Sequence, residues 1–227
     1  TDVIGAVELA TTTEYADIWT DASEAEVIFK LKRTTGDGAV GTIFQDTNGD
    51  IFFFMSDNML FHVLDNTFAG DPRFGTMLDL NVSTFGEPVV GKYLGTDANP
   101  GLNDIKLFRA SELYLIRAEA YARSGQFEMA AADMTALRAA RGSAGTTSYS
   151  SEEIALFDII EIERRLELGY EGHRYFDMRR QGLSLSRSEI DCEAAAGACS
   201  LPSDDFKWIM PIPQAELFAN ENMTQNT

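Results

Sequence analysis

The chain has 227 residues, enough for one or two domains, and its 44% hydrophobic and 24% charged residues are typical of a folded globular protein. Its formal net charge of −18, from 18 Lys and Arg against 36 Asp and Glu, repels polyphosphates and anionic lipid surfaces. No cationic patch offsets this charge, so the sequence excludes ordinary nucleic-acid binding. No run reaches the roughly 18 apolar residues of a membrane span. The sequence begins at Thr1 without a signal peptide or a lipid-acceptor cysteine, so we expect a processed or truncated chain.

Residues 1–103 predict a loop-rich segment that contains short strands. Residues 3–19 resemble the end of a helix followed by a loop. In 26–32 the alternation of apolar and polar side chains has the period of two that favours a half-buried strand. Asn48-Gly49, between two apolar runs, predicts a hairpin with a tight turn. The Gly- and Pro-rich residues 70–100 are typical of loop.

The sequence becomes helical from Asp104 onward. Two apolar stripes with helical spacing lie in 104–141 and are joined by Ser124-Gly125. They predict an antiparallel helical hairpin like those of tetratricopeptide repeats. Because about three such repeats are needed to bury their faces, we expect another repeat or other packing to cover this hairpin. We expect 1–103 and 104–227 to belong to one structural domain of a mainly α protein.

Further helices are predicted toward the C-terminus. Ser150 and Glu153 have the spacing of a capping box and open a third long helix that ends at Gly169 or Gly172. A short helix follows from about residue 173 to 180, and Pro213 can begin a terminal helix.

Two cysteines, Cys192 and Cys199, lie in a loop-like segment that offers no histidine as a metal ligand. We interpret them as a disulfide that closes a small surface loop, which favours an oxidising compartment. Two reduced thiols without a function are the alternative.

A run of carboxylates invites an enzymatic interpretation, because Glu163, Glu167 and Glu171 recur every four residues along one helix face. Paired carboxylates serve glycosidases. However, arginines lie within helical reach, and an ion-pair network explains the pattern better. The expected structural network comprises Glu163, Arg164, Glu167, Glu171, Arg174, Asp177 and Arg180. The common nucleophile and phosphate motifs are absent, so we expect no enzyme.

Metal binding has weak support in the sequence. Asp46, Asn48 and Asp50 alternate like the opening of a calcium loop, but Ile51 stands where the turn glycine is expected. A hairpin turn explains the same residues, so calcium binding here is left open. His62 and His173 have no metal-ligand spacing. We expect no metal and no cofactor.

Three stretches together resemble the SusD/RagB family of nutrient-uptake lipoproteins of Bacteroidota. They are RASELYLIRAEAYARSG at 109–125, IEIERRLELGYEGHRYFDMRR at 160–180 and IMPIPQAELFANENMTQN at 209–226. The second matches the family's ER..E...EG.R..D..R pattern. The resemblance is strong over 104–227 and looser before it, where EVIF and DPR look like landmarks around a variable insert.

This resemblance implies a nutrient-binding protein on the extracellular face of the outer membrane. Such a protein caps a SusC-like TonB-dependent transporter and captures glycans, oligosaccharides or peptides for import. Family members are about twice as long, so the N-terminal half, with the lipid that anchors the protein to the membrane, corresponds to sequence that this chain does not contain. A tetratricopeptide-like adaptor and a hydrolase are the competing hypotheses.

Aromatic residues in the insert are the candidate ligand contacts. Three consecutive phenylalanines at 52–54 cannot all point inward from one strand, so at least one is free to stack on a sugar ring. In the resembled family, ligand contacts lie in this variable insert. The candidates are Trp19, Phe44, Asn48, Asp50, Phe52 and Phe54. The alternative is that these aromatics belong to the core.

Overall fold

The computed structural model describes residues 2–45, 50–67, 70–79, 89–96, 98–142, 153–194 and 199–226. The chain is mainly helical, as the sequence predicts, and divides into two compact units, Thr1–Gly172 and His173–Thr227. The division falls after Gly172 and not near residue 104, because strands from 1–103 and 104–227 pair within the first unit.

The first unit contains six strands, seven α-helices and two 3-10 helices among the described residues. In chain order they are α1 (Asp2–Ala6), α2 (Thr12–Trp19), β1 (Val27–Leu31), η1 (Val40–Ile43), α3 (Asp57–Asn66), α4 (Pro72–Met77), β2 (Leu78–Asp79), β3 (Val89–Val90), η2 (Gly91–Tyr93), β4 (Gly95–Thr96), β5 (Asn99–Pro100), β6 (Ile105–Arg109), α5 (Ala110–Arg123), α6 (Phe127–Ala140) and α7 (Glu153–Glu167).

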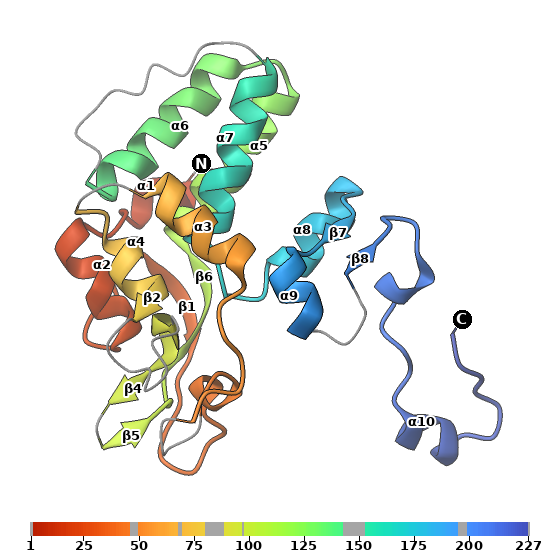
Figure 1. The fold of residues 1–227 in the computed structure, drawn as a ribbon. Coiled ribbons are helices and arrows are strands. Elements are labelled where there is room, and N and C mark those ends of the chain that lie inside the picture. Colours follow the sequence, from red (N-terminus) through yellow and green to blue (C-terminus); the bar gives the residue numbers. More distant parts are fainter. Residues whose placement is uncertain are drawn as a thin grey trace. The chain divides into compact units, whose positions relative to one another are not determined.

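The helices α5, α6 and α7 pack together around the largest apolar core of the first unit (Figure 1). The predicted hairpin is formed by α5 and α6, and Gly125, with a φ of +75°, lies in the turn between them. Small side chains at Ala118 and Ala130 permit close packing, and Leu156 and Ile160 of α7 cover the pair. Thus α7 of the same chain covers part of the hairpin, which is the second of the two expected kinds of cover, packing other than a further repeat.

An antiparallel ribbon of β1 and β6 joins two segments that lie far apart in the sequence (Figure 1). Phe29 lies opposite Phe108, their ring centroids 6.3 Å apart, and both are about half exposed. Lys106 and Arg109 are buried instead. The strand predicted at 26–32 is present, but its apolar side chains at Phe29 and Leu31 face outward because paired charges occupy the inner side.

Residues 70–100, predicted to be mostly loop, contain several short elements. Pro72 opens α4, and the Asp71 side chain accepts a hydrogen bond from the Arg73 N–H at 2.9 Å. The strand β2 pairs with β3, and β4 pairs with β5, each over two residues. The sequence missed these elements because Gly and Pro mark short strand ends and loops alike.

Two predicted features include residues that the structure does not describe. The hairpin turn at Asn48-Gly49 lies outside the described residues, although a bridge between Gln45 and Ile51 flanks it. The capping residue Ser150 also lies outside them, and α7 begins at Glu153.

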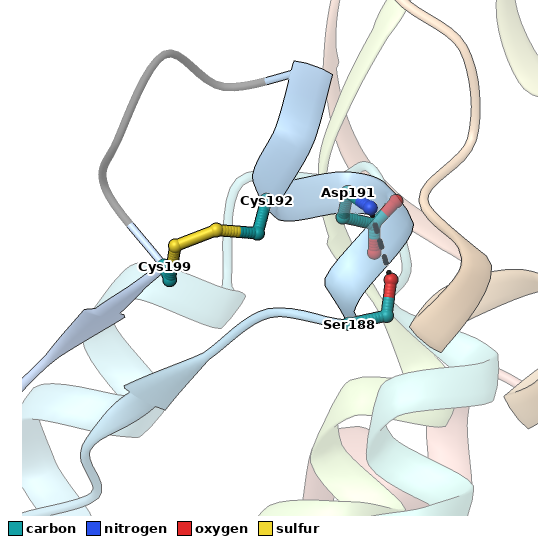
Figure 2. The surroundings of a disulfide bond; sticks show 4 residues. All are labelled: Ser188, Asp191, Cys192 and Cys199. Atoms are coloured by element: carbon teal, nitrogen blue, oxygen red, sulfur yellow. Dashed lines mark hydrogen bonds between the residues drawn. A yellow bond between two sulfur atoms is a disulfide. The ribbon is translucent and has the colours of Figure 1, made fainter.

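The second unit contains α8 (Arg174–Gln181), β7 (Leu185–Ser186), α9 (Glu189–Ala194), β8 (Ser200–Leu201), η3 (Phe206–Trp208) and α10 (Gln214–Ala219). A disulfide joins Cys192 of α9 to Cys199, next to β8 (Figure 2). The adjacent Asp191 N–H donates to Ser188 Oγ at 3.1 Å at the start of α9 (Figure 2).

The C-terminal segment folds back on itself within the second unit. The Gln225 amide accepts from the Ile212 N–H at 2.8 Å and donates to the Ile212 carbonyl at 3.0 Å. The Asn226 amide donates to the Met210 carbonyl at 3.0 Å. These bonds give the two polar residues of the family-like ending a structural role. No helix in the described part of the chain combines the length and apolarity needed to cross a membrane.

Candidate functional site

Residues 50–56 form a segment that we call the aromatic loop. It presents three phenylalanines to solvent. The side chains of Phe52, Phe53 and Phe54 are 58%, 63% and 49% exposed. The backbone N–H groups of Phe52 and Phe53 both donate to the Phe44 carbonyl, at 2.8 and 3.3 Å. The loop therefore departs from strand alternation, and all three rings remain accessible.

Phe44 anchors the aromatic loop from behind. Its ring stacks on Tyr93, with centroids 6.1 Å apart and planes at 5°, and meets Tyr170 edge-on at 5.7 Å. The Tyr93 hydroxyl donates to the Tyr170 carbonyl at 3.2 Å, which fixes the two tyrosines together. Phe44, predicted as a ligand contact, thus lies against the core because two aromatic partners hold it there.

A close backbone contact fixes the base of the same loop. The Gly41 N–H donates to the Gly101 carbonyl at 2.9 Å. A Cβ atom on Gly41 would lie 2.0 Å from the Tyr93 carbonyl oxygen and 2.5 Å from Gly101 Cα. Only glycine fits here without backbone movement, so Gly41 positions the segment that leads to Phe44.

The three glutamates of the predicted network point into the first unit. Glu163 and Glu167 are fully buried, and the Glu171 side chain is 3% exposed. Their ion pairs reach cations on α4, on η2, on β6 and at the C-terminal end of α6. The cations are Arg73, Lys92, Arg109, Arg138 and Arg141, and the carboxylates are Glu26, Asp71, Glu163, Glu167 and Glu171. We call these ten residues the charged core.

Glu167 is the centre of the charged core. Its Oε1 lies 2.8 Å from both Arg109 Nη1 and Arg141 Nη2, and those two arginines also pair with Glu26. Arg109 reaches Glu171 as well, at 2.7 Å, and Lys92 Nζ lies 2.7 Å from the same carboxylate. Each buried charge therefore has several partners, which offsets the large cost of removing it from water.

The electrostatics of the charged core favour ionised carboxylates. Burial by itself raises the pKa of Glu167, but Arg141 and Arg109 outweigh it and hold that pKa well below its ordinary value. Burial likewise opposes ionisation of Glu171, and Arg109 and Lys92 lower its pKa overall. Burial lowers the pKa of Lys92, with partial compensation by Glu171. A general acid needs a raised carboxyl pKa, so these groups are poorly suited to glycoside hydrolysis.

Trp19 lies over the charged core and away from solvent. It is 3% exposed, and its ring centroid is 4.5 Å from Lys92 Nζ and 5.3 Å from the Arg109 guanidinium. Such contacts favour a cation near a ring face. Among the described residues, the buried Trp19 Nε1 has no hydrogen-bond partner. Trp19, predicted as a ligand contact, therefore lies inside the first unit, where its ring covers buried cations.

The remaining predicted site residues lie in different places. Asp50 is exposed at the start of the aromatic loop, and Asn48 lies outside the described residues. Arg164 is buried on α7. In the second unit, Asp177 pairs with Arg180 at 3.1 Å, and Arg174 begins α8. The network predicted as one set thus falls in two separate units.

Metal binding gains no support from the described residues. Within them, no group of three or more His, Cys, Asp or Glu side chains is arranged to hold a metal ion. Asp46 lies outside them, so the calcium question at 46–50 stays open. His62 Nε2 lies 3.2 Å from the Ile162 carbonyl, and this contact ties α3 to α7.

Several members of the charged core escaped sequence reasoning. Glu26 and Arg141 are 115 residues apart and carry no local signal, yet Arg141 Nη2 lies 2.9 Å from Glu26 Oε2. Arg73 and Arg109 stand within the DPR landmark and the first family-like stretch. Because both segments look like landmarks of the resembled family, they could have indicated that these arginines are partners of the glutamates.

Comparisons with known proteins bear on these features. A family model described as the SusD family matches residues 89–227, more than half of the chain. No match was found among curated proteins. A SusD superfamily protein from Bacteroides thetaiotaomicron is similar in structure, with 25% identity, a TM-score of 0.78, and coverage of 97% of this chain and 52% of its own.

Two other solved structures share the fold. A SusD superfamily protein from Bacteroides vulgatus has 22% identity, a TM-score of 0.75, and coverage of 99% of this chain and 51% of its own. Surface glycan-binding protein A from Bacteroides uniformis has 22% identity, a TM-score of 0.66, and coverage of 97% and 53%. The chain spans about half the length of the solved structures that it matches.

Proposed function

Because this chain belongs to the SusD family, we propose that it binds glycans through its aromatic loop as the surface component of an outer-membrane uptake system. In that system a SusC-like TonB-dependent transporter is the partner, and the location is the extracellular face of the outer membrane. The anchoring lipid would be carried by sequence outside this chain. The ligand is an oligosaccharide or longer glycan, with a peptide as the alternative.

The exposed triplet Phe52, Phe53 and Phe54 carries this proposal. Burying a phenylalanine side chain is worth about 1.5–3 kcal/mol, so leaving three adjacent rings in water forgoes substantial stabilisation. Sugar rings present apolar faces that can recover part of it by stacking on such rings. One similar structure is named as a surface glycan-binding protein, which supports this class of ligand.

The competing functions have less support. A tetratricopeptide-like adaptor would bind through the faces of the helical hairpin, but α7 covers the apolar stripes of α5 and α6. A hydrolase would need an available carboxyl pair, but Glu163, Glu167 and Glu171 are buried among arginines and a lysine. Both observations favour binding without turnover.

A glycan array followed by titration calorimetry tests the proposal. The 227-residue chain should bind at least one oligosaccharide class, and the double variant Phe52→Ala, Phe54→Ala should weaken that binding at least tenfold. The control is Phe218→Ala on α10, which removes an even more exposed phenylalanine from the second unit. Equal binding by the double variant and the unaltered chain would contradict the proposal.

A further inference from the structure

We infer that Tyr170 is a positioning residue for the aromatic loop, because it packs against both of the apolar cores to which the two ends of that loop are attached. The consequence for ligand binding rests on the proposed function. Tyr170 follows α7 in the sequence and is partly buried, and Glu171 of the charged core comes directly after it. It lies far from the loop along the chain, so only the fold brings the two together.

The first connection lies on the N-terminal side of the aromatic loop, at Phe44. The Tyr170 ring meets the Phe44 ring edge-on, with centroids 5.7 Å apart and planes at 88°. The Phe44 carbonyl in turn accepts the backbone N–H groups of Phe52 and Phe53, at 2.8 and 3.3 Å. Phe44 therefore links Tyr170 to the exposed triplet through one ring contact and two hydrogen bonds.

The second connection lies on the C-terminal side of the loop, at Met55. This residue directly follows Phe54, and it is only 6% exposed. Met55 belongs to an apolar core that also contains Met59 and Val63 of α3, and Tyr170 packs against that core. The chain is therefore anchored immediately after the last exposed phenylalanine.

Tyr170 joins the two anchoring regions. It packs against the apolar core that contains Met55 and also against the one that contains Tyr93, on which Phe44 lies. A loop held at both ends has fewer accessible conformations than a loop held at one end. One side chain that contacts both cores can thus restrict the position of the rings between them.

The backbone at Tyr170 supports a specific role for this residue. Its φ is +64°, in the left-handed region that bulky side chains rarely adopt. Such a conformation persists only where the surrounding structure holds it, and it is found preferentially at functional sites. Here the Tyr93 hydroxyl donates to the Tyr170 carbonyl at 3.2 Å, and Glu171 pairs with Lys92 and Arg109, each at 2.7 Å. These contacts fix the turn that directs the Tyr170 ring toward Phe44.

Hydrogen exchange and glycan titration of Tyr170 variants test this inference. Tyr170→Asn removes the ring, and asparagine tolerates the left-handed backbone. The backbone amides of Phe52 and Phe53 should exchange roughly tenfold faster in this variant, and glycan affinity should fall roughly tenfold, whereas amides within α5 and α6 should keep their rates. Tyr170→Phe keeps the ring and should restore both quantities to within about twofold of the unaltered chain.

The matched control is Phe127→Asn. It removes a partly buried aromatic ring from the first residue of α6, where that ring packs against the apolar core of α5, α6 and α7. The loop amides and the glycan affinity should be unaffected by this change, whatever its effect on the melting temperature. Equal losses in Phe127→Asn and Tyr170→Asn would assign the effect to general destabilisation and overturn the inference.

The remaining outcomes separate this inference from the proposed function. Unchanged exchange and unchanged affinity in Tyr170→Asn would overturn the inference and leave glycan binding at the aromatic loop intact. Loss of affinity that Tyr170→Phe does not restore would also overturn it, since the ring would then not be the positioning group. Absence of binding by the unaltered chain would overturn the proposed function, and the exchange rates would still decide whether Tyr170 positions the loop.

Discussion

Glu167 shows how much the first unit depends on single buried charges. Its carboxylate receives Arg109 and Arg141, and both arginines would lose a partner if it were removed. Breaking a buried ion pair by deleting one member costs about 3–5 kcal/mol, because the remaining charge stays buried without compensation.

We therefore expect Glu167→Ala to lower the melting temperature by roughly 6–20 °C, at about 2–4 °C per kcal/mol for a domain of this size. Circular dichroism melts measure the change. Glu128→Ala, at an exposed position on α6, should leave the melting temperature within a few degrees of the unaltered chain. An unchanged melt combined with lost glycan binding would move Glu167 from a structural role to a ligand-contact role.

The same carboxylates set a pH dependence. The pKa values of Glu167 and Glu171 are lowered in the folded chain, so both bind protons more readily when unfolded. Their contribution to stability is complete above the unfolded pKa of about 4.3 and is lost as pH falls through the lower folded values. Urea midpoints should fall steeply below about pH 4, and less so in Glu167→Gln. A midpoint that rose on acidification would contradict this sign.

At the scale of elements, a close backbone contact between Gly41 and Gly101 fixes the base of the aromatic loop. Gly41→Ala should displace the base of the aromatic loop, because the new Cβ would clash with the Tyr93 carbonyl at 2.0 Å. We expect at least tenfold weaker glycan binding and faster proteolysis within 44–56. Gly38→Ala is the matched control, since its Cβ would meet only the end of the Arg33 side chain, at 3.4 Å. Equal behaviour of the two variants would show that the loop does not need the contact.

The small elements of the second unit depend on a covalent constraint. Cys192 and Cys199 close a short loop between α9 and β8, and the loop-closure relation gives about 2–3 kcal/mol of stabilisation for this separation. Titration of the unfolded, unreduced chain should find no free thiol. Two titratable thiols would disprove the disulfide and return the pair to the reduced alternative.

At the scale of the whole molecule, the outer face of the β1–β6 ribbon is a further uncovered apolar surface of the first unit, in addition to the aromatic loop. Phe29, Leu31 and Phe108 are each 44–54% exposed. Large exposed apolar patches are unusual on monomers and mark interaction surfaces. The solved structures that the chain resembles are about twice as long.

We expect the 227-residue chain alone to self-associate or to bind a hydrophobic dye, and the double variant Phe29→Ser, Phe108→Ser to reduce either effect. Light scattering and dye fluorescence measure it, with Phe218→Ala as a control in the second unit. A monomer with negligible dye binding would show that these exposed side chains need no cover.

The sequence by itself determined the helical hairpin, the third long helix, the strand at 26–32 and the family. Those features rest on local periodicity and on motifs within about twenty residues, such as Glu163 and Glu167, which are spaced by four on α7. It also indicated that at least one of the phenylalanines at 52–54 is exposed, because three adjacent aromatics cannot share one face of a strand.

Only the tertiary structure decided which charges meet and which aromatics remain outside. The side chains of Arg109 and Arg141 both reach Glu26, because β1 pairs with β6 and α6 packs against α7. No local sequence pattern encodes this arrangement of three charges. Trp19 lies inside because the buried cations there favour a ring face, whereas Phe52 lies outside because the backbone of its loop is tied to Phe44. Desolvated charges require partners from several elements at once, and that requirement is satisfied only in three dimensions.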